Sequence, residues 1–300
     1  MNCPTCGTLL PDTPDAFCGE CGAQLGALAP DSARSLQVEV GSLTNVGITR
    51  AEPNQDHIIA VQQPGFGLFA VADGMGGHQC GDVASEVALE RLYEVVKERL
   101  GQGGERSSVG VTPDAGATLD PDAPALDPAA FLRLAILEAH AAVTRFNQTQ
   151  GADAGSTLTA ALLIGEQIFI GHVGDSRAYQ VSEGRLTQIT NDHSLVGDLC
   201  RKGFLTKEEI YTHPRRSEIL QSLGQPGDPP EVELHRLTGT PGLQILLCSD
   251  GLWEMVRDPA IEQIITSAPT AAAAAEALIE AANDGGGEDN ISAVIIQCLR

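Results

Sequence analysis

Apolar runs that border an aspartate restrict the fold of this 300-residue chain more than any other feature. Four such runs are present: 67–72 before Asp73, 168–173 before Gly174 and Asp175, 243–249 before Asp250, and 291–296 after Asp289. Their length and composition predict buried β-strands. In an antiparallel sheet the end of one strand lies beside the start of its neighbour, so all four carboxylates are expected at one sheet edge. Each contact pair would repel by about 4 kcal/mol at an effective dielectric of about 20, and divalent cations between them would remove this repulsion.

Each aspartate also has an ordinary structural interpretation. Asp-Gly is foremost a turn dipeptide, Asp250 could be the N-cap of a following helix, and Asp289 with Asn290 could form a hairpin turn. Their joint occurrence with the acidic segment 54–56, Asn-Gln-Asp, favours one shared site instead. An all-oxygen set of ligands suits Mg²⁺ or Mn²⁺ better than Zn²⁺.

The rest of the pattern mixes strands with helices. Further strands are expected at 36–40, 57–61, 157–164, 177–181 and 232–237, and helices at 82–100, 128–147, 258–267 and 270–283. The first two helices each carry one apolar stripe at three-to-four spacing. Helices that arrive in pairs between strand runs fit helical layers packed on a mainly antiparallel sandwich, which is an α+β fold. They fit a strict βαβ alternation poorly.

Two segments of the predicted main domain, 36–300, depart from this pattern. Residues 101–127 are rich in Gly, Pro, Ala, Ser, Thr and Asp, and contain no aromatic residue. A structureless connection of this length is uncommon in a compact domain, so a disordered insertion is predicted. Residues 191–230 are predicted to form a mobile flap that contacts substrate, and the alternative is a solvated surface excursion. The flap carries five basic residues: Arg201, Lys202, Lys207, Arg215 and Arg216.

Two Cys-x-x-Cys pairs, each followed by glycine, lie at the start of the chain. Their cysteines are Cys3, Cys6, Cys18 and Cys21. Four thiolates suit tetrahedral Zn²⁺ and leave no ligand position open for a substrate. Residues 1–25 are therefore predicted to form a structural zinc ribbon, followed by a linker at 26–35. Disulfides are the alternative, and a reducing compartment argues against them.

The acidic composition limits the partners. The chain has 40 acidic and 18 basic side chains, a formal charge of −22. Nucleic-acid backbones and anionic lipid surfaces attract basic patches, so neither is an expected partner. No stretch approaches about 18 consecutive apolar residues, and the first residues lack the pattern of a signal peptide, so a cytoplasmic protein is expected.

The acidic motifs resemble, as an ordered set, the metal-dependent Ser/Thr protein phosphatases of type 2C, bacterial branch. The resemblance covers roughly residues 36–300. Its motifs are Asn54-Gln55-Asp56, Asp73-Gly74-Met75-Gly76-Gly77, Gly155-Ser156-Thr157, Gly174-Asp175-Ser176-Arg177-Ala178-Tyr179, Asp192-His193-Ser194, Ser249-Asp250-Gly251-Leu252-Trp253 and Glu288-Asp289-Asn290. The fold it implies is a four-layer αββα sandwich with metals in a cleft at one edge.

The resemblance also implies a role for each acidic residue. Asp73 would bridge two Mn²⁺ or Mg²⁺ ions, and Gly74 would offer its carbonyl to one of them. Asp250 and Asp289 would complete the shell of the other ion. The remaining roles fall on the following residues: Asp56 would hold metal-bound water, and Asp175 with Asp250 would hold a weaker third metal.

Two positions depart from the family pattern. Relatives usually carry an arginine five residues before the position of Asp56, where this chain has Ala51. Arg50, one residue earlier, is the predicted phosphate-binding residue, and a one-residue bulge would restore its direction. Met75 stands where several relatives have a histidine proposed as general acid, which leaves the proton donor to the leaving group unassigned.

The implied activity is hydrolysis of phosphoserine and phosphothreonine in proteins. A water between two divalent ions loses its proton far more easily than bulk water, and direct attack on phosphorus is expected. Expected partners are phosphoprotein substrates and a cognate Ser/Thr kinase, and the protein is expected to be a monomer. The alternative is a catalytically weak phosphoprotein- or partner-binding regulator on the same fold. A zinc-ribbon nucleic-acid binder is disfavoured by the charge.

Overall fold

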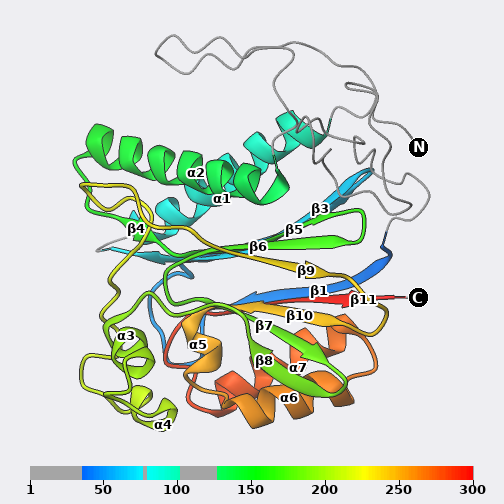
Figure 1. Cartoon of the computed structure of the whole chain (residues 1–300). Coiled ribbons are helices and arrows are strands. Elements are labelled where there is room, and N and C mark those ends of the chain that lie inside the picture. Colours follow the sequence, from blue (N-terminus) through cyan, green and yellow to red (C-terminus); the bar gives the residue numbers. More distant parts are fainter. Residues whose placement is uncertain (1–35, 77–79, 102–126, 300) are drawn as a thin grey trace, which may run out of the picture. The chain divides into compact units, whose positions relative to one another are not determined.

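Two antiparallel β-sheets pack face to face, and a layer of helices covers the outer face of each (Figure 1). The computed structural model describes residues 36–76, 80–101 and 127–299. The order of layers is helix, sheet, sheet, helix, which confirms the expected α+β sandwich. The predicted zinc ribbon at 1–25, the linker at 26–35 and nearly all of the predicted insertion at 101–127 lie outside the described residues.

The first sheet has five strands and is covered by the C-terminal helices. Its order is β1 (Val38–Asn45), β11 (Ile291–Cys298), β10 (Gln244–Cys248), β7 (Arg177–Ser182) and β8 (Arg185–Gln188). The covering helices are α5 (Asp250–Trp253), α6 (Asp258–Ser267) and α7 (Ala271–Asp284). The alanine-rich α7 lies directly on β1, because a Cβ atom on Gly41 would stand 2.1 Å from the carbonyl oxygen of Ala271.

The second sheet is covered by two long helices. Its order is β2 (Asp56–Gln63), β3 (Phe66–Met75), β5 (Leu158–Ile164), β6 (Gln167–Val173) and β9 (Glu233–Thr238), and the short β4 (Gly155–Ser156) pairs with the end of β3. The helices are α1 (Cys80–Leu100) and α2 (Pro128–Gln150). Helix α2 approaches β6 closely at Gly171, where a Cβ atom would stand 2.5 Å from Ile136 Cδ1.

The central strands are apolar on both faces because each sheet is buried on both sides. One face packs against helices, and the other face packs against the opposite sheet. Side chains between the sheets come from both of them and include Phe69, Val71, Ile170, Ile245, Leu247 and Val294. This double burial explains why the sequence shows continuous apolar runs in place of alternation.

Several elements differ from the expectation. Strand β1 runs to Asn45, well past the predicted 36–40, because every residue of Val38–Asn45 pairs with β11. The short β4, β8 and α5 were not predicted. Residues 191–230 contain two short helices, α3 (Leu195–Arg201) and α4 (Lys207–Ile210). Among the described residues, no helix has both the length and the apolar character that a membrane span needs.

Candidate metal centre

Asp56 and Asp73 face each other across two neighbouring strands. Asp56 begins β2 and is the direct cross-strand partner of Asp73. The expectation that Asp73 follows its strand was wrong, because the pairing continues through Gly74 to Met75 against β4. Burial raises the pKa of Asp56 to about 6, although the hydroxyl of Ser249 donates a 2.6 Å hydrogen bond to its Oδ2. Ser249 therefore holds the Asp56 carboxylate in place, a role that the sequence did not predict.

Asp73 stands among other negative charges. Burial raises its pKa well above the usual range, and the carboxylates of Asp56, Asp250 and Asp175 raise it further. The same causes, burial first and then Asp56, raise the pKa of Asp250. The structure thus brings together acidic residues that the sequence separates by up to about 200 positions. The expectation of one shared sheet edge was wrong, because β3 and β6 belong to one sheet and β10 and β11 to the other.

Asp250 is the first residue of α5 and not its N-cap. The N-cap is Ser249, whose side chain makes no capping hydrogen bond and turns to Asp56 instead. Helix α5 lies against the start of β11, because a Cβ atom on Gly251 would stand 2.1 Å from the carbonyl oxygen of Asn290. This close approach brings Asp250 next to Asp289.

Arg50 and Asp289 meet at the edge of the group. The Arg50 guanidinium forms an ion pair with Asp289 Oδ1 and a longer one, at 3.5 Å, with Glu52. Asn290 holds the neighbouring chain in place, since its Oδ1 accepts a 2.8 Å hydrogen bond from the amide of Gln55. The predicted phosphate-binding arginine therefore lies beside a predicted metal ligand, and the supporting role of Asn290 was missed.

Asp175 lies at the turn between β6 and β7. It is 3% exposed, and its backbone oxygen accepts a 3.0 Å hydrogen bond from Trp253 Nε1. Burial raises its pKa well above the usual range, and the charges of Asp250 and Asp192 add to this. Asp175 is therefore electrostatically coupled to Asp250, its expected partner at a third metal.

Buried carboxylate oxygens without hydrogen bonds mark the group as a cation site. Among the described residues, four buried side-chain atoms lack a hydrogen-bond partner, and three of them are Oδ1 of Asp56, Asp175 and Asp250. Buried polar atoms in native proteins are nearly always satisfied, so these oxygens need a partner of another kind. Hard divalent cations bind carboxylate oxygens, and Mg²⁺ or Mn²⁺ fits this donor set. The role of the Gly74 carbonyl stays a prediction.

The raised pKa values predict how pH affects the metal-free protein. A carboxyl group whose pKa is higher in the folded than in the unfolded chain binds more protons when folded, so its contribution to stability falls as pH rises between the two values. In EDTA, Asp73→Asn should therefore gain stability relative to wild type as the pH rises from about 4 to about 7. We expect a difference above about 1 kcal/mol at pH 7, measured by urea unfolding. A difference that does not change with pH would contradict the repulsion argument.

The basic residues of segment 191–230 are distributed unevenly around the group. Arg216 forms an ion pair with Glu254 of the α5 C-cap at 3.3 Å, and burial followed by the charge of Asp250 raises the pKa of that glutamate. Arg215 instead pairs with Glu218, at 2.7 Å, on the exposed surface of the segment. Lys202 pairs with Asp198 of its own helix. Of these three side chains, only Arg216 reaches the neighbourhood of the acidic group.

A buried ion pair that the sequence did not reveal anchors this segment. Arg177 donates from Nε and Nη2 to the two carboxylate oxygens of Asp192, at 2.9 and 2.6 Å. The Arg177 guanidinium also lies 3.6 Å from the ring centroid of Trp253. The pair was missed because its two residues belong to different motifs whose contact depends on the fold.

The buried carboxylate group with its unsatisfied oxygens and the adjoining Arg50 fit a centre that holds divalent cations. The sequence model of the family described as Protein phosphatase 2C matches residues 47–285. The chain belongs to the protein phosphatase 2C family.

Relatives and solved structures agree with this assignment. The chain is 36% identical to "Serine/threonine phosphatase stp" of Listeria monocytogenes over 232 residues, which are 77% of this chain and 84% of the relative. It is 35% identical to "Serine/threonine protein phosphatase PstP" of Mycobacterium tuberculosis over 87% of this chain and 45% of that longer relative. The crystal structure of the M. tuberculosis phosphatase PstP/Ppp matches with a TM-score of 0.72 and 33% identity, covering 88% and 99% of the two chains. The PstP catalytic domain in complex with two manganese ions matches with a TM-score of 0.71 and 31% identity, covering 89% and 100%.

Proposed function

We propose that this chain is a protein serine/threonine phosphatase that requires Mn²⁺ or Mg²⁺ and hydrolyses phosphoserine and phosphothreonine. The observation that carries the proposal is the set of buried carboxylate oxygens without hydrogen-bond partners. Relatives named as Ser/Thr phosphatases, at 35–36% identity, support the same reaction. A binding module without chemistry would have no need to bury several mutually repelling acids. The direct test is phosphate release from a phosphothreonine peptide in Mn²⁺, and its absence would overturn the proposal.

The residues divide the work of the reaction. Asp73, Asp250 and Asp289 would hold two ions with the carbonyl of Gly74, and Asp175 with Asp250 would hold a weaker third. When bound, the ions neutralise phosphate charge and lower the pKa of water. Arg50, beside Asp289, can donate two hydrogen bonds to phosphate oxygens and orient the ester. Ser249 fixes one oxygen of Asp56, which leaves the other oxygen of Asp56 to orient the water.

Arg216 is the flap residue best placed to bind substrate. Arg216→Ala should raise KM for a phosphopeptide by about three- to tenfold, and KM for para-nitrophenyl phosphate by less, because only the peptide extends past the phosphate. Arg215→Ala is the matched control, since Arg215 pairs with Glu218 on the exposed surface. The exposed Arg215–Glu218 pair contributes only about 0–1 kcal/mol to stability, and the Arg216 side chain is itself 38% exposed, so both variants should fold. Equal effects of the two substitutions, or equal effects on the two substrates, would reject a substrate contact.

We also propose that residues 1–25 form a zinc ribbon with a targeting role. The support is the sequence pattern of Cys3, Cys6, Cys18 and Cys21. A closed tetrahedral shell has no position for substrate, and an acidic chain favours a protein as the ribbon's partner. Phosphoproteins and a cognate Ser/Thr kinase are the proposed partners, and the proposed state is a monomer in the cytoplasm.

Removal of the ribbon tests its separation from the chemistry. A chain that begins at Ser35 should keep kcat on para-nitrophenyl phosphate within about threefold, a change under about 0.7 kcal/mol in the barrier. The full chain should bind one equivalent of Zn²⁺, and a Cys18→Ser/Cys21→Ser variant should lose it. If the shortened chain folds but has no turnover, the ribbon belongs to the active site and the two-part organisation is wrong.

A further inference from the structure

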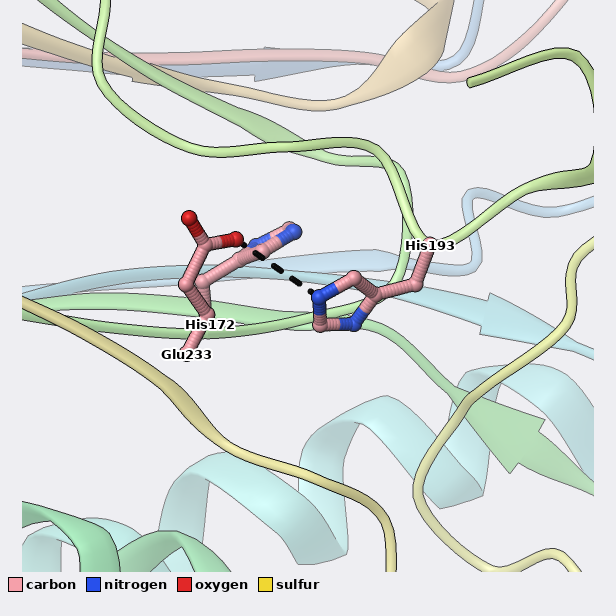
Figure 2. A group of neighbouring side chains, drawn as sticks. All are labelled: His172, His193 and Glu233. Carbon is pink, nitrogen blue, oxygen red and sulfur yellow. Dashed lines mark ion pairs between the residues drawn. The ribbon is translucent and has the colours of Figure 1, made fainter. Parts of the chain in front are cut away.

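A second group of side chains that could ligate a metal lies beside the turn at Gly174. In the described part of the chain, His172, His193 and Glu233 place one ligand atom each within 4.8 Å of one another (Figure 2). Their hydrogen bonds argue against a metal. His172 Nε2 donates to the backbone oxygen of Asn191 at 3.1 Å, and the hydroxyl of Thr159 bonds to Nδ1 at 2.8 Å. Burial and the neighbouring His193 lower the pKa of His172 to about 4, so the ring is neutral and both nitrogens are in use.

His193 makes a two-point contact with the residue that precedes Asp175. Its backbone N–H donates to the Gly174 oxygen at 2.6 Å, and the Gly174 N–H donates to His193 Nδ1 at 3.3 Å. Because an amide N–H can only donate, Nδ1 is the unprotonated nitrogen and Nε2 carries the proton. Nε2 faces Glu233 Oε2 at 3.6 Å, and Figure 2 shows the two side chains directed toward each other. Burial alone would raise the pKa of Glu233, but the adjacent His193 and hydrogen bonds from Asn191 and His235 lower it to about 2, so a carboxylate faces the ring.

The Gly174 turn has little freedom of its own. Gly174 has φ +113°, a conformation that favours glycine, and a Cβ atom there would stand 2.6 Å from Thr157 Cβ. On the other side of the turn, Trp253 Nε1 holds the Asp175 backbone oxygen at 3.0 Å. The backbone that carries the Asp175 side chain is therefore held by His193 on one side and by Trp253 on the other.

The same histidine joins the two ends of segment 194–220, the inner part of the flap. Its backbone oxygen accepts hydrogen bonds from Leu220 N at 2.7 Å and from Gln221 N at 3.4 Å. Two residues further on, Leu195 N donates to the Glu218 oxygen at 2.9 Å. The segment 194–220 therefore begins and ends at His193. A change in its conformation acts first on the residue that holds Gly174.

We propose that His193 is a positioning residue that couples the flap to the Asp175 carboxylate through the hydrogen bond from Gly174. The inference rests on the proposed role of Asp175 in holding the weakest-bound cation. A flap occupied by a phosphoprotein would keep Asp175 in place, and a displaced flap would release it. His193 thereby ties the third cation to substrate binding, a link that the metal ligands alone do not provide.

Two substitutions separate the hydrogen bond from the bulk of the side chain. In His193→Asn, Oδ1 takes the place of Nδ1 and can still accept from Gly174 N–H, whereas His193→Gln puts its acceptor one atom further out. Mn²⁺ binding by calorimetry should show the weakest Kd raised about fivefold or more in His193→Gln and close to wild type in His193→Asn. In the metal-free protein, the Gly174 amide should exchange with solvent faster in His193→Gln only. The tighter Mn²⁺ sites should be unchanged in both variants.

The outcomes separate the coupling from the role of Asp175. If Asp175→Ala leaves every Mn²⁺ Kd unchanged, the assignment of Asp175 as a ligand fails. If Asp175→Ala removes the weakest site but the two His193 variants match each other, the coupling is wrong. Nitrogen NMR of the wild-type protein gives a check that needs no variant. His193 Nδ1 should show the chemical shift of an unprotonated nitrogen and a scalar coupling to the Gly174 amide. A protonated Nδ1, or the absence of this coupling, overturns the proposal.

Discussion

Asp73→Ala and Asp250→Ala are each expected to remove nearly all turnover and to leave the fold intact. Both aspartates lie in the buried carboxylate group, and the pKa of each is raised by burial and by the charge of Asp56. Without either of them, the remaining acids cannot hold the ions in a fixed geometry. Because each substitution also removes a charge that repels its neighbours, the metal-free protein should not lose stability.

The measurement is kcat on para-nitrophenyl phosphate and on a phosphothreonine peptide at saturating Mn²⁺, with circular dichroism as the test of folding. A variant that keeps more than about a tenth of wild-type kcat, equivalent to about 1.4 kcal/mol of barrier, would show that its assigned role is wrong. Asp284→Ala is a matched control, since Asp284 is an exposed aspartate at the end of α7. Its turnover should stay within about twofold of wild type.

Removal of divalent cations is the second change with a large expected effect. EDTA should lower turnover more than about 100-fold, which corresponds to roughly 2.7 kcal/mol, because positioning and charge neutralisation both depend on the ions. Added Mn²⁺ should restore the activity. Undiminished turnover in EDTA would exclude the proposed chemistry.

Thiol alkylation is the control that distinguishes this mechanism from a cysteine-based one. Cys248 immediately precedes the catalytic segment, but it is fully buried, and burial raises its pKa far above the usual thiol range. Burial also raises the pKa of Cys298, to about 11. Neither thiol is a nucleophile at neutral pH. Iodoacetamide should therefore leave turnover intact while zinc stays bound. Loss of turnover after alkylation would point to a thiol in the reaction.

The sequence predicted the elements whose cause is local. The long apolar strands and the two long helices follow from continuous or periodic hydrophobicity, and the aspartates at strand ends follow from antiparallel pairing. The short β8 and α5 lack such a signal, because four residues form a strand or a helical turn only where neighbours hold them. The predicted strand before Asp73 ended three residues too early for a similar reason, since the continuation of β3 to Met75 depends on its pairing with β4.

The acidic residues of the candidate site could be predicted from the sequence, but the residues that hold them in place by hydrogen bonds could not. Ser249 supports Asp56 from 193 positions away, and Asn290 supports Gln55 from 235 positions away. Neither residue type signals such a role, because serine and asparagine near a turn are ordinary. Arg177 also has many possible acceptors in an acidic chain, and its pairing with Asp192 is decided only when both are buried.

The predicted ligands come from both sheets of the sandwich. Asp56 and Asp73 lie on β2 and β3 of one sheet, and Asp250 and Asp289 flank β10 and β11 of the other. Ions shared between them would act as a reversible cross-link between the two sheets. Binding of the ions would then also hold the two sheets together. Because the ions bind only the folded chain, they would raise its free energy of unfolding. Metal affinity in such a protein depends on the distance between the two sheets. A substitution that changes the core volume far from the ions can therefore alter the metal affinity.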